Sequence, residues 1–230
     1  MRRLIIFLKF IILVLCLALL VWGGYQGYDF YQRTVEEQKI LNQIIERLSA
    51  DSRIAEVLVT GVEFDPITQK KMTTIKFLEY NSVGEPLEPK YFTFVGNIIQ
   101  FQSLVVRFED EFIRSGEALR GKSVYLFWKV FVLDGDRTQS YNITEMDAVP
   151  AGYRVRAAHN EVEQEIWQRF WDYALNSKHA VTKGIKNAQI EAPGTRFVPG
   201  ILYTLKIEHD GGIRIDHRKI PAILRGETIY

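Results

Sequence analysis

The chain has little of three features from which a function is commonly read. Its 230 residues include a single cysteine, Cys16, which excludes a disulfide framework. Its 29 basic and 28 acidic residues nearly balance, so it lacks the basic surplus with which proteins bind nucleic acid. It has only four histidines, and none belongs to the H-E-x-x-H pattern of a helical zinc site. The sequence therefore predicts no metal, no cofactor and no nucleic-acid partner.

What the chain does have is an apolar run from Leu4 to Trp22, in which 15 of 19 residues are Leu, Ile, Phe or Val. As a helix the run would span about 28 Å, close to the roughly 30 Å hydrocarbon core of a bilayer. Its apolar residues favour insertion by roughly 4–9 kcal/mol, whereas Lys9 opposes it by at most about 3 kcal/mol and can reach the near interface. The run predicts a membrane anchor, marked along its length by Leu4, Lys9, Leu13, Leu17 and Trp22.

Charges on either side of the run predict its orientation. Arg2, Arg3 and Lys9 lie at its N-terminal end, whereas acidic residues follow it. The N-terminus is therefore expected in the cytoplasm and the rest of the chain outside it. The alternative is a cleaved signal peptide with 10–22 as its apolar region. No A-x-A site follows, which favours an uncleaved anchor, and both alternatives export the remaining residues.

The residues after the anchor predict an amphipathic helix beside the membrane, over 25–52. An apolar stripe with i, i+3, i+4 spacing runs along it and consists of Ile40, Leu41, Ile44, Ile45 and Leu48. The stripe can pack on the chain's own domain, or it can join two copies, because it resembles a short coiled-coil seam. Leu41, Ile44 and Leu48 are therefore candidates for a dimer interface.

Residues 53–157 predict a β-rich extracytoplasmic domain. Segments rich in β-branched and aromatic residues, separated by turn-forming residues, cover 54–64, 72–80, 91–108, 123–133 and 137–144. Five or six strands are enough for a sandwich or a barrel. The charge-dense residues 109–120 are expected to form a short helix or a loop.

Residues 158–230 predict a helix and a final β-hairpin that pack on this domain. Asn160 is expected to cap a helix that ends near Asn176. Its wide apolar face contains Trp167 and Trp171, which can lie in the core, or one of them can contact a partner at the edge. A second short helix is expected over 177–184, and a connecting loop over 192–200.

In the hairpin, a three-residue loop at 210–212 would pair Ile207 with Ile215 on one face. On the other face the same register would place Glu208 opposite Arg214 and Lys206 opposite Asp216. These pairs would leave His209 and His217 about 13 Å apart along the ladder. The acidic and histidine residues around the hairpin are therefore not expected to bind a metal.

Residues 116–123 match the P-loop pattern G-x-x-x-x-G-K-S in full. A working P-loop opens a helix whose N-terminal N–H groups meet the phosphates, whereas Lys122 and Ser123 precede a strand-like segment. The match is interpreted as accidental, and no nucleotide is expected as a ligand.

These patterns predict an α+β fold: an N-terminal transmembrane helix, a juxtamembrane amphipathic helix, and a mainly antiparallel β domain with a packed helix and a C-terminal β-hairpin. Residues 1–24 would form a cytoplasmic stub and the anchor. The expected role is non-enzymatic, with the bilayer and either other proteins or a second copy as partners. The alternative is a membrane-tethered hydrolase with a site assembled from Glu109, Asp110, Glu111 and His159.

Overall fold

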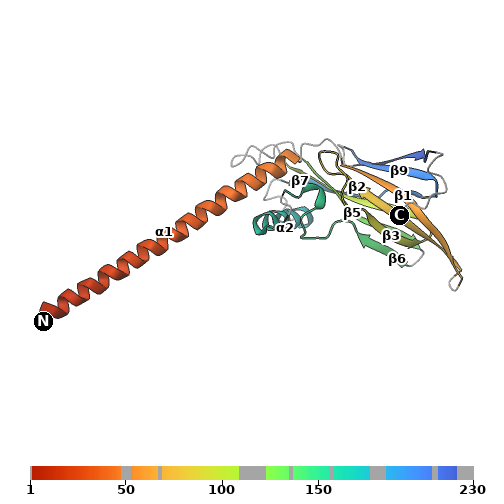
Figure 1. Cartoon of the computed structure of the whole chain (residues 1–230). Coiled ribbons are helices and arrows are strands. Elements are labelled where there is room, and N and C mark those ends of the chain that lie inside the picture. The colour runs from red at the N-terminus through yellow and green to blue at the C-terminus, as the bar shows by residue number, and fades with distance from the viewer. Residues whose placement is uncertain are drawn as a thin grey trace.

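The chain folds into a β-sandwich domain from which one long helix projects (Figure 1). The computed structural model describes residues 2–47, 53–66, 69–108, 123–134, 137–155, 158–176, 185–208 and 212–221. In the long helix, α1 (Arg2–Arg47), side chains are described from Leu13 onward, except those of Val14 and Ile45. The N-terminus lies at the far end of this helix, away from the domain.

The domain contains two antiparallel sheets of five strands each. The first has the order β10-β9-β1-β2-β3 and consists of β1 (Arg53–Asp65), β2 (Lys70–Glu79), β3 (Lys90–Val95), β9 (Ile201–Ile207) and β10 (Ile213–Lys219). The second has the order β6-β5-β4-β7, with β8 also paired to β4; it consists of β4 (Ile98–Phe108), β5 (Ser123–Asp134), β6 (Arg137–Asn142), β7 (Ile185–Glu191) and β8 (Gly194–Arg196). The C-terminal part of the chain therefore contributes strands to both sheets.

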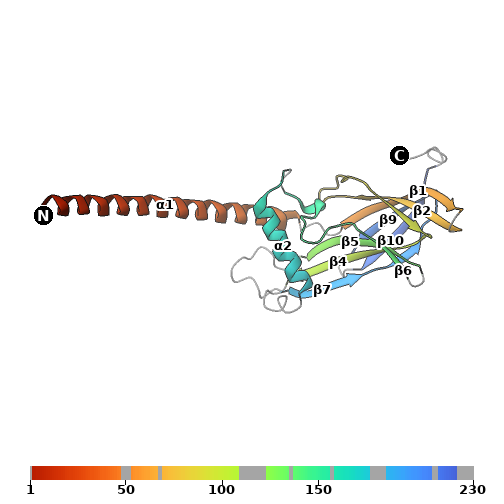
Figure 2. The same ribbon diagram turned by 90° about the horizontal axis from the view of Figure 1, so that it is seen from below.

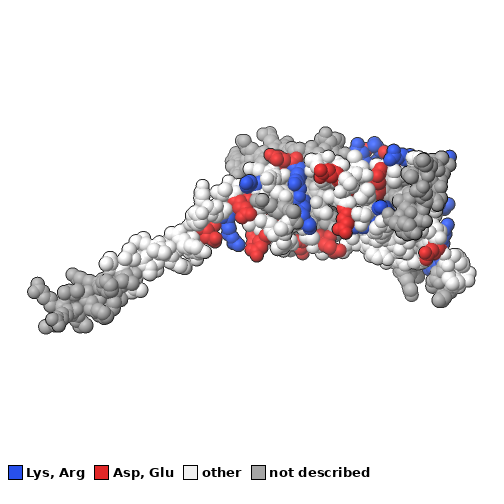
Figure 3. All heavy atoms as spheres, viewed as in Figure 1, with Lys and Arg blue, Asp and Glu red and all other residues white. Residues whose placement is uncertain are grey.

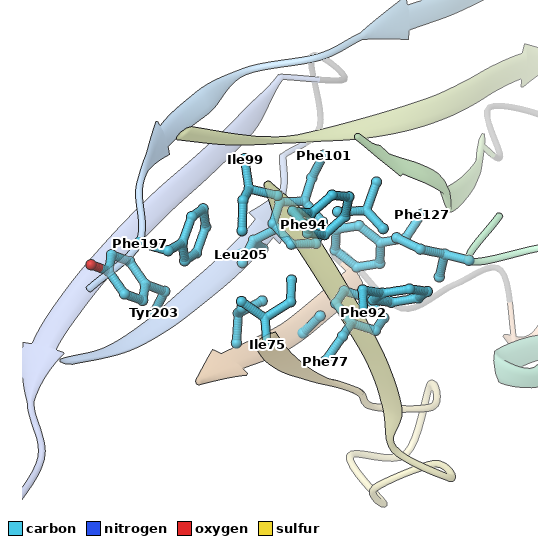
Figure 4. Packing of buried hydrophobic residues seen from close by; sticks show 14 of the residues in the cluster. Ile75, Phe77, Phe92, Phe94, Ile99, Phe101, Phe127, Phe197, Tyr203 and Leu205 are labelled. Atoms are coloured by element: carbon cyan, nitrogen blue, oxygen red, sulfur yellow. The ribbon is translucent and has the colours of Figure 1, made fainter. Parts of the chain in front are cut away.

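The first core lies between the two sheets and is rich in aromatic rings (Figure 4). Along β1, β2, β3 and β9, alternate residues point inward, as a sheet with one buried face requires. Phe77 of β2 stacks on Phe101 of β4 at a centroid distance of 5.7 Å and meets Phe127 of β5 edge-on at 5.6 Å. Phe197 extends the cluster from Phe101 to Tyr203 of β9. These rings join the two sheets into one sandwich.

A second core covers the other face of the second sheet, so β4 and β5 are buried on both sides. Three consecutive residues of β4, Leu104, Val105 and Val106, have no exposed surface. Val105 faces the first core, whereas Leu104 and Val106 face helix α2 (Glu161–Leu175) and the C-terminal part of α1 (Figure 2). The near-continuous apolar sequences of β4 and β5 follow from this position between two layers.

Much of the expected architecture is confirmed. The fold is α+β; the described residues form two α-helices and antiparallel sheets, with six strands among those described between 53 and 142. Helix α2 begins where expected, because the Asn160 side chain accepts a hydrogen bond from the Glu163 N–H at 2.9 Å. The helix ends at Leu175, one residue before the expected end.

Two strands are absent from the sequence prediction. β7 has the sequence IKNAQIE, which lacks a β-branched or aromatic run, yet it pairs along β4 from Ser103 to Phe108. β8 lies inside the segment 192–200 that was expected to be a loop. Both form because β4 offers a long edge whose backbone groups need partners. The helix expected over 177–184 and the segment 109–120 lie outside the described residues.

The register expected for the last hairpin is wrong. Ile207 pairs with Ile213 instead of Ile215, and Lys206 pairs with Arg214. The apolar pattern has a period of two, so both registers keep the isoleucines on one face and the pattern cannot separate them. The expected register rested on charge pairs between residues directly opposite each other. In the observed register Arg214 still forms ion pairs, with Glu208 diagonally across the strands and with Asp216 at 3.0 Å on its own strand. Exposed pairs of this kind contribute only about 0.2–1 kcal/mol and do not determine register.

Candidate functional site

The junction between α1 and the domain is the best-defined candidate site of the described residues. Ile40 and Ile44 of α1 are 0% and 4% exposed, and they belong to the second core together with Leu104, Val106 and Leu126. Two buried aliphatic side chains one turn apart are what an amphipathic helix offers to a sheet. The last part of α1 is therefore a core element of the domain as well as the base of the projecting helix.

Polar contacts between α1 and the domain surround these two isoleucines. The Glu37 carboxylate pairs with Arg169 of α2 at 2.7 Å, and the Asn160 amide donates to Glu36 at 3.1 Å. Near the end of α1, the Arg47 guanidinium donates to the backbone carbonyl of Arg154. These contacts and the two isoleucines together form what we call the anchor junction.

The ion pair in the anchor junction is expected to contribute little to stability. Arg169 and Glu37 are 53% and 40% exposed, so water screens their attraction. Glu37→Gln should lower the free energy of unfolding by less than about 1 kcal/mol, measured by urea denaturation. Glu165→Gln, which removes the weaker 3.5 Å contact within α2, is the matched control. A loss above about 2 kcal/mol for Glu37→Gln would mean that the pair is screened far less than its exposure indicates.

Beyond the junction, α1 is an exposed apolar helix that we call the shaft, residues 13–31. Its large apolar side chains are between 54% and 74% exposed: Leu13, Leu15, Leu17, Leu19, Leu20, Val21, Trp22, Tyr25, Tyr28, Phe30 and Tyr31. No charged residue occurs between Lys9 and Asp29, and Figure 3 shows the described shaft without acidic or basic atoms until it approaches the domain. Within the described residues, no helix combines the length and apolarity needed to cross a membrane.

The residues predicted as an interface lie mostly inside the domain. Ile44, Trp167 and Trp171 are 4%, 2% and 1% exposed, and all three belong to the second core. Leu41 is half-buried, and Leu48 lies outside the described residues. The stripe considered as a dimer seam is thus used, at Ile44, to dock the chain's own domain, and the two tryptophans have no exposed edge to offer a partner.

The residues considered for catalysis and ligand binding are not assembled by the described structure. His159 is exposed two residues before the start of α2, while 109–111 lie outside the described residues. Of the P-loop match, only Ser123 is described, and it opens a strand. Among the described residues, no three His, Cys, Asp or Glu side chains gather closely enough to hold a metal ion.

The outer face of the first sheet carries a polar cluster that the sequence does not predict. The Tyr80 hydroxyl donates to Glu56 at 2.8 Å, and the Arg218 guanidinium lies 3.5 Å from the same carboxylate. The three residues come from distant parts of the chain and share no motif, so only the pairing of β1 with β2 and β9, and of β9 with β10, brings them together. Burial raises the pKa of Tyr80 above its ordinary value of 10.0; the hydrogen bond and charge of Glu56 raise it further, and Arg218 opposes them.

The raised pKa of Tyr80 predicts a loss of stability at alkaline pH. The folded state holds the phenolic proton more tightly than the unfolded state, so this contribution is complete below pH 10.0 and is lost as the pH rises through the folded pKa. Tyr80→Phe should therefore reduce the fall in the free energy of unfolding above pH 10.0, measured by urea denaturation across that range. Tyr91→Phe, at an exposed tyrosine of the same sheet, is the control. An unchanged alkaline slope in Tyr80→Phe would contradict the prediction.

The fold and the anchor junction define a β-sandwich protein whose second core includes the base of a long projecting helix. Comparison with known proteins finds no matching family model, no matching curated protein and no matching solved structure.

Proposed function

We propose that this protein is a single-pass membrane protein that holds a non-enzymatic β-sandwich domain outside the cytoplasm and presents it to protein partners. One observation carries the proposal: a single helix has an exposed apolar shaft at one end and two core residues of the domain at the other. Such a helix would join a membrane anchor to the folded domain without a flexible linker between them.

The shaft supports the anchoring part of the proposal. Each square ångström of apolar surface left in water costs roughly 25 cal/mol, and the part of the shaft up to Trp22 is apolar around its whole circumference. A bilayer covers such a helix on all sides, whereas a single protein surface covers one face. The run Leu4–Trp22 lies within α1, and the basic residues Arg2, Arg3 and Lys9 at its start favour a cytoplasmic N-terminus.

The outer face of the first sheet supports the presenting part of the proposal. Among the described elements, both helices lie against the second sheet, so the first sheet keeps one face uncovered (Figure 2). That face carries exposed apolar side chains, such as Ile54 at 37% and Tyr91 at 50%, beside the charged residues Glu56 and Arg218. Non-obligate protein interfaces are about as apolar as the rest of a protein surface, so this mixed face is compatible with such an interface.

Anchoring and orientation are tested together with the full chain. A reporter that is active only outside the cytoplasm, fused after Tyr230, is expected to be active, and the chain is expected to stay in the membrane pellet after alkaline extraction. Leu13→Arg combined with Leu17→Arg, which places two charges in the shaft, should move the chain to the supernatant. An inactive reporter on a membrane-bound wild-type chain would overturn the orientation, and extraction of the wild type would overturn the anchor.

The presenting role is tested by affinity capture from detergent-solubilised membranes. Capture with the full chain is compared with capture by residues 1–52 fused to an unrelated folded domain. The proposal expects a partner that the full chain recovers in stoichiometric amount and the control does not. If both recover the same proteins, or neither recovers any, the β-sandwich has no presenting role.

A further inference from the structure

Five residues of α1 recur at alternating intervals of three and four: Val21, Gly24, Tyr28, Tyr31 and Val35. On a helix that turns about 100° per residue, this spacing forms one narrow stripe, the spacing with which two helices pack side by side. The four side chains are 73%, 63%, 64% and 43% exposed, and no atom lies within 4 Å of the Cβ position at Gly24. We call this stripe the outer seam.

The outer seam lies on the side of α1 that faces away from the domain. Nine residues turn a helix by about 900°, which is two full turns and a half. Tyr31 is nine residues before Ile40, and Val35 is nine residues before Ile44, so each is opposite a residue buried in the second core. Tyr28 is in the same way opposite Glu37, which binds α2. The domain and the outer seam therefore use opposite faces of one helix.

Lipid cannot cover the upper half of the outer seam. Tyr28, Tyr31 and Val35 follow Trp22 by about 9, 14 and 20 Å along the helix axis. The headgroup region adds only about 5–8 Å beyond the hydrocarbon core on each side. Tyr31 and Val35 thus stand beyond the bilayer if the apolar run spans it, where only a protein surface can cover them.

The charges of α1 indicate which partner fits. The charged residues of this stretch, Asp29, Arg33, Glu36 and Glu37, all lie off the outer seam, and the positions flanking it at 25, 27, 32 and 34 are Tyr, Gly, Gln and Thr. In a parallel pair of identical helices, equivalent residues meet across a twofold axis, so a charged seam would repel itself and an uncharged one does not. Anchoring in one membrane, as proposed above, imposes this parallel orientation, and Gly24 lets the two backbones approach.

We infer that two copies of this chain pair through the outer seam, with their domains on the outside of a central pair of α1 helices. This inference rests on the proposed anchoring. It assigns the dimer contact to one face of α1, because the domain already occupies the opposite face, which contains Ile44.

Disulfide trapping in native membranes tests the pairing. In a Cys16→Ser background, Tyr28→Cys and Tyr31→Cys are compared with Gln26→Cys, which is exposed and lies nine residues before Val35, on the opposite face. Disulfides form only where Cα atoms come within about 7 Å, so mild oxidation should give at least about tenfold more covalent dimer for Tyr31→Cys than for Gln26→Cys.

Equal trapping at Tyr31→Cys and Gln26→Cys, or no trapping in a chain that stays in the membrane pellet, would overturn the pairing and leave the anchor intact. A wild-type chain that leaves the pellet would overturn the anchor, and the parallel pair that depends on it would fail as well. The two failures are therefore distinguishable in one set of samples.

A second measurement separates pairing from folding. Tyr28→Glu combined with Tyr31→Glu should convert the detergent-solubilised chain from two copies to one in a mass measurement, while Gln26→Glu should leave two. The thermal midpoint of the domain should not change, because both tyrosines are more than 60% exposed. A double variant that still contains two copies would overturn the inference.

Discussion

Replacing Trp171 with alanine is expected to lower the free energy of unfolding by about 3–5 kcal/mol. Its side chain is 1% exposed and packs against Trp128 and Phe170 at ring distances of 6.2 and 5.9 Å. Its indole N–H also donates to the Ala148 carbonyl at 2.9 Å, which ties the chain before α2 to the helix. The measurement is urea denaturation of the full chain in detergent, followed by far-UV circular dichroism.

Phenylalanine variants separate the hydrogen bond from the packing. Trp167 is 2% exposed, but its buried indole N–H has no partner, so Trp167→Phe removes ring volume and no hydrogen bond. Trp171→Phe removes ring volume and the hydrogen bond to Ala148, so it should cost about 1 kcal/mol more than Trp167→Phe. Leu175→Ala, on the same helix at 41% exposure, is the control and should cost well under the tryptophan value. Equal losses for Trp171→Ala and Leu175→Ala would contradict the burial of α2.

The position of these tryptophans shows what the apolar periodicity of a helix can predict and what it cannot. A wide apolar arc on a helix predicts burial of some face, but it does not say what covers each edge. The missing information was in the strands: β4 and β5 are apolar on successive residues, which indicates two covered faces and therefore a helical layer on the second sheet. Two helices share that layer, and α1 covers what α2 leaves open.

Other features could not be assigned from the sequence alone. β7 forms because β4 presents an unpaired edge, and its own residues carry little strand preference. The Tyr80 cluster depends on three segments that become neighbours only in the folded sheet. The outer seam is present in the sequence, yet it could not be assigned to a free face until Ile40 and Ile44 were located in the core. In each case the missing information was the identity of a neighbour, which local pattern does not contain.

Removing the two isoleucines of the anchor junction is the second large effect expected. Ile40→Ala and Ile44→Ala should each lower the free energy of unfolding by about 2–5 kcal/mol, because both side chains are almost fully buried and alanine leaves a cavity. Leu175→Ala, on α2 and 41% exposed, should cost less than about 1 kcal/mol. Urea denaturation of the three full-length variants in detergent gives the comparison.

The same contact makes α1 more than a tether. If α1 only attached the domain, replacing 34–47 with a flexible Gly/Ser segment of equal length would leave the stability of the sandwich unchanged. Because Ile40 and Ile44 lie among Leu104, Val106 and Leu126, that replacement should instead expose the second core and abolish a single cooperative unfolding transition. Retention of the wild-type midpoint after the replacement would show that the sandwich is independent of α1. Loss of the transition would mean that the domain folds fully only when it is joined to its own helix.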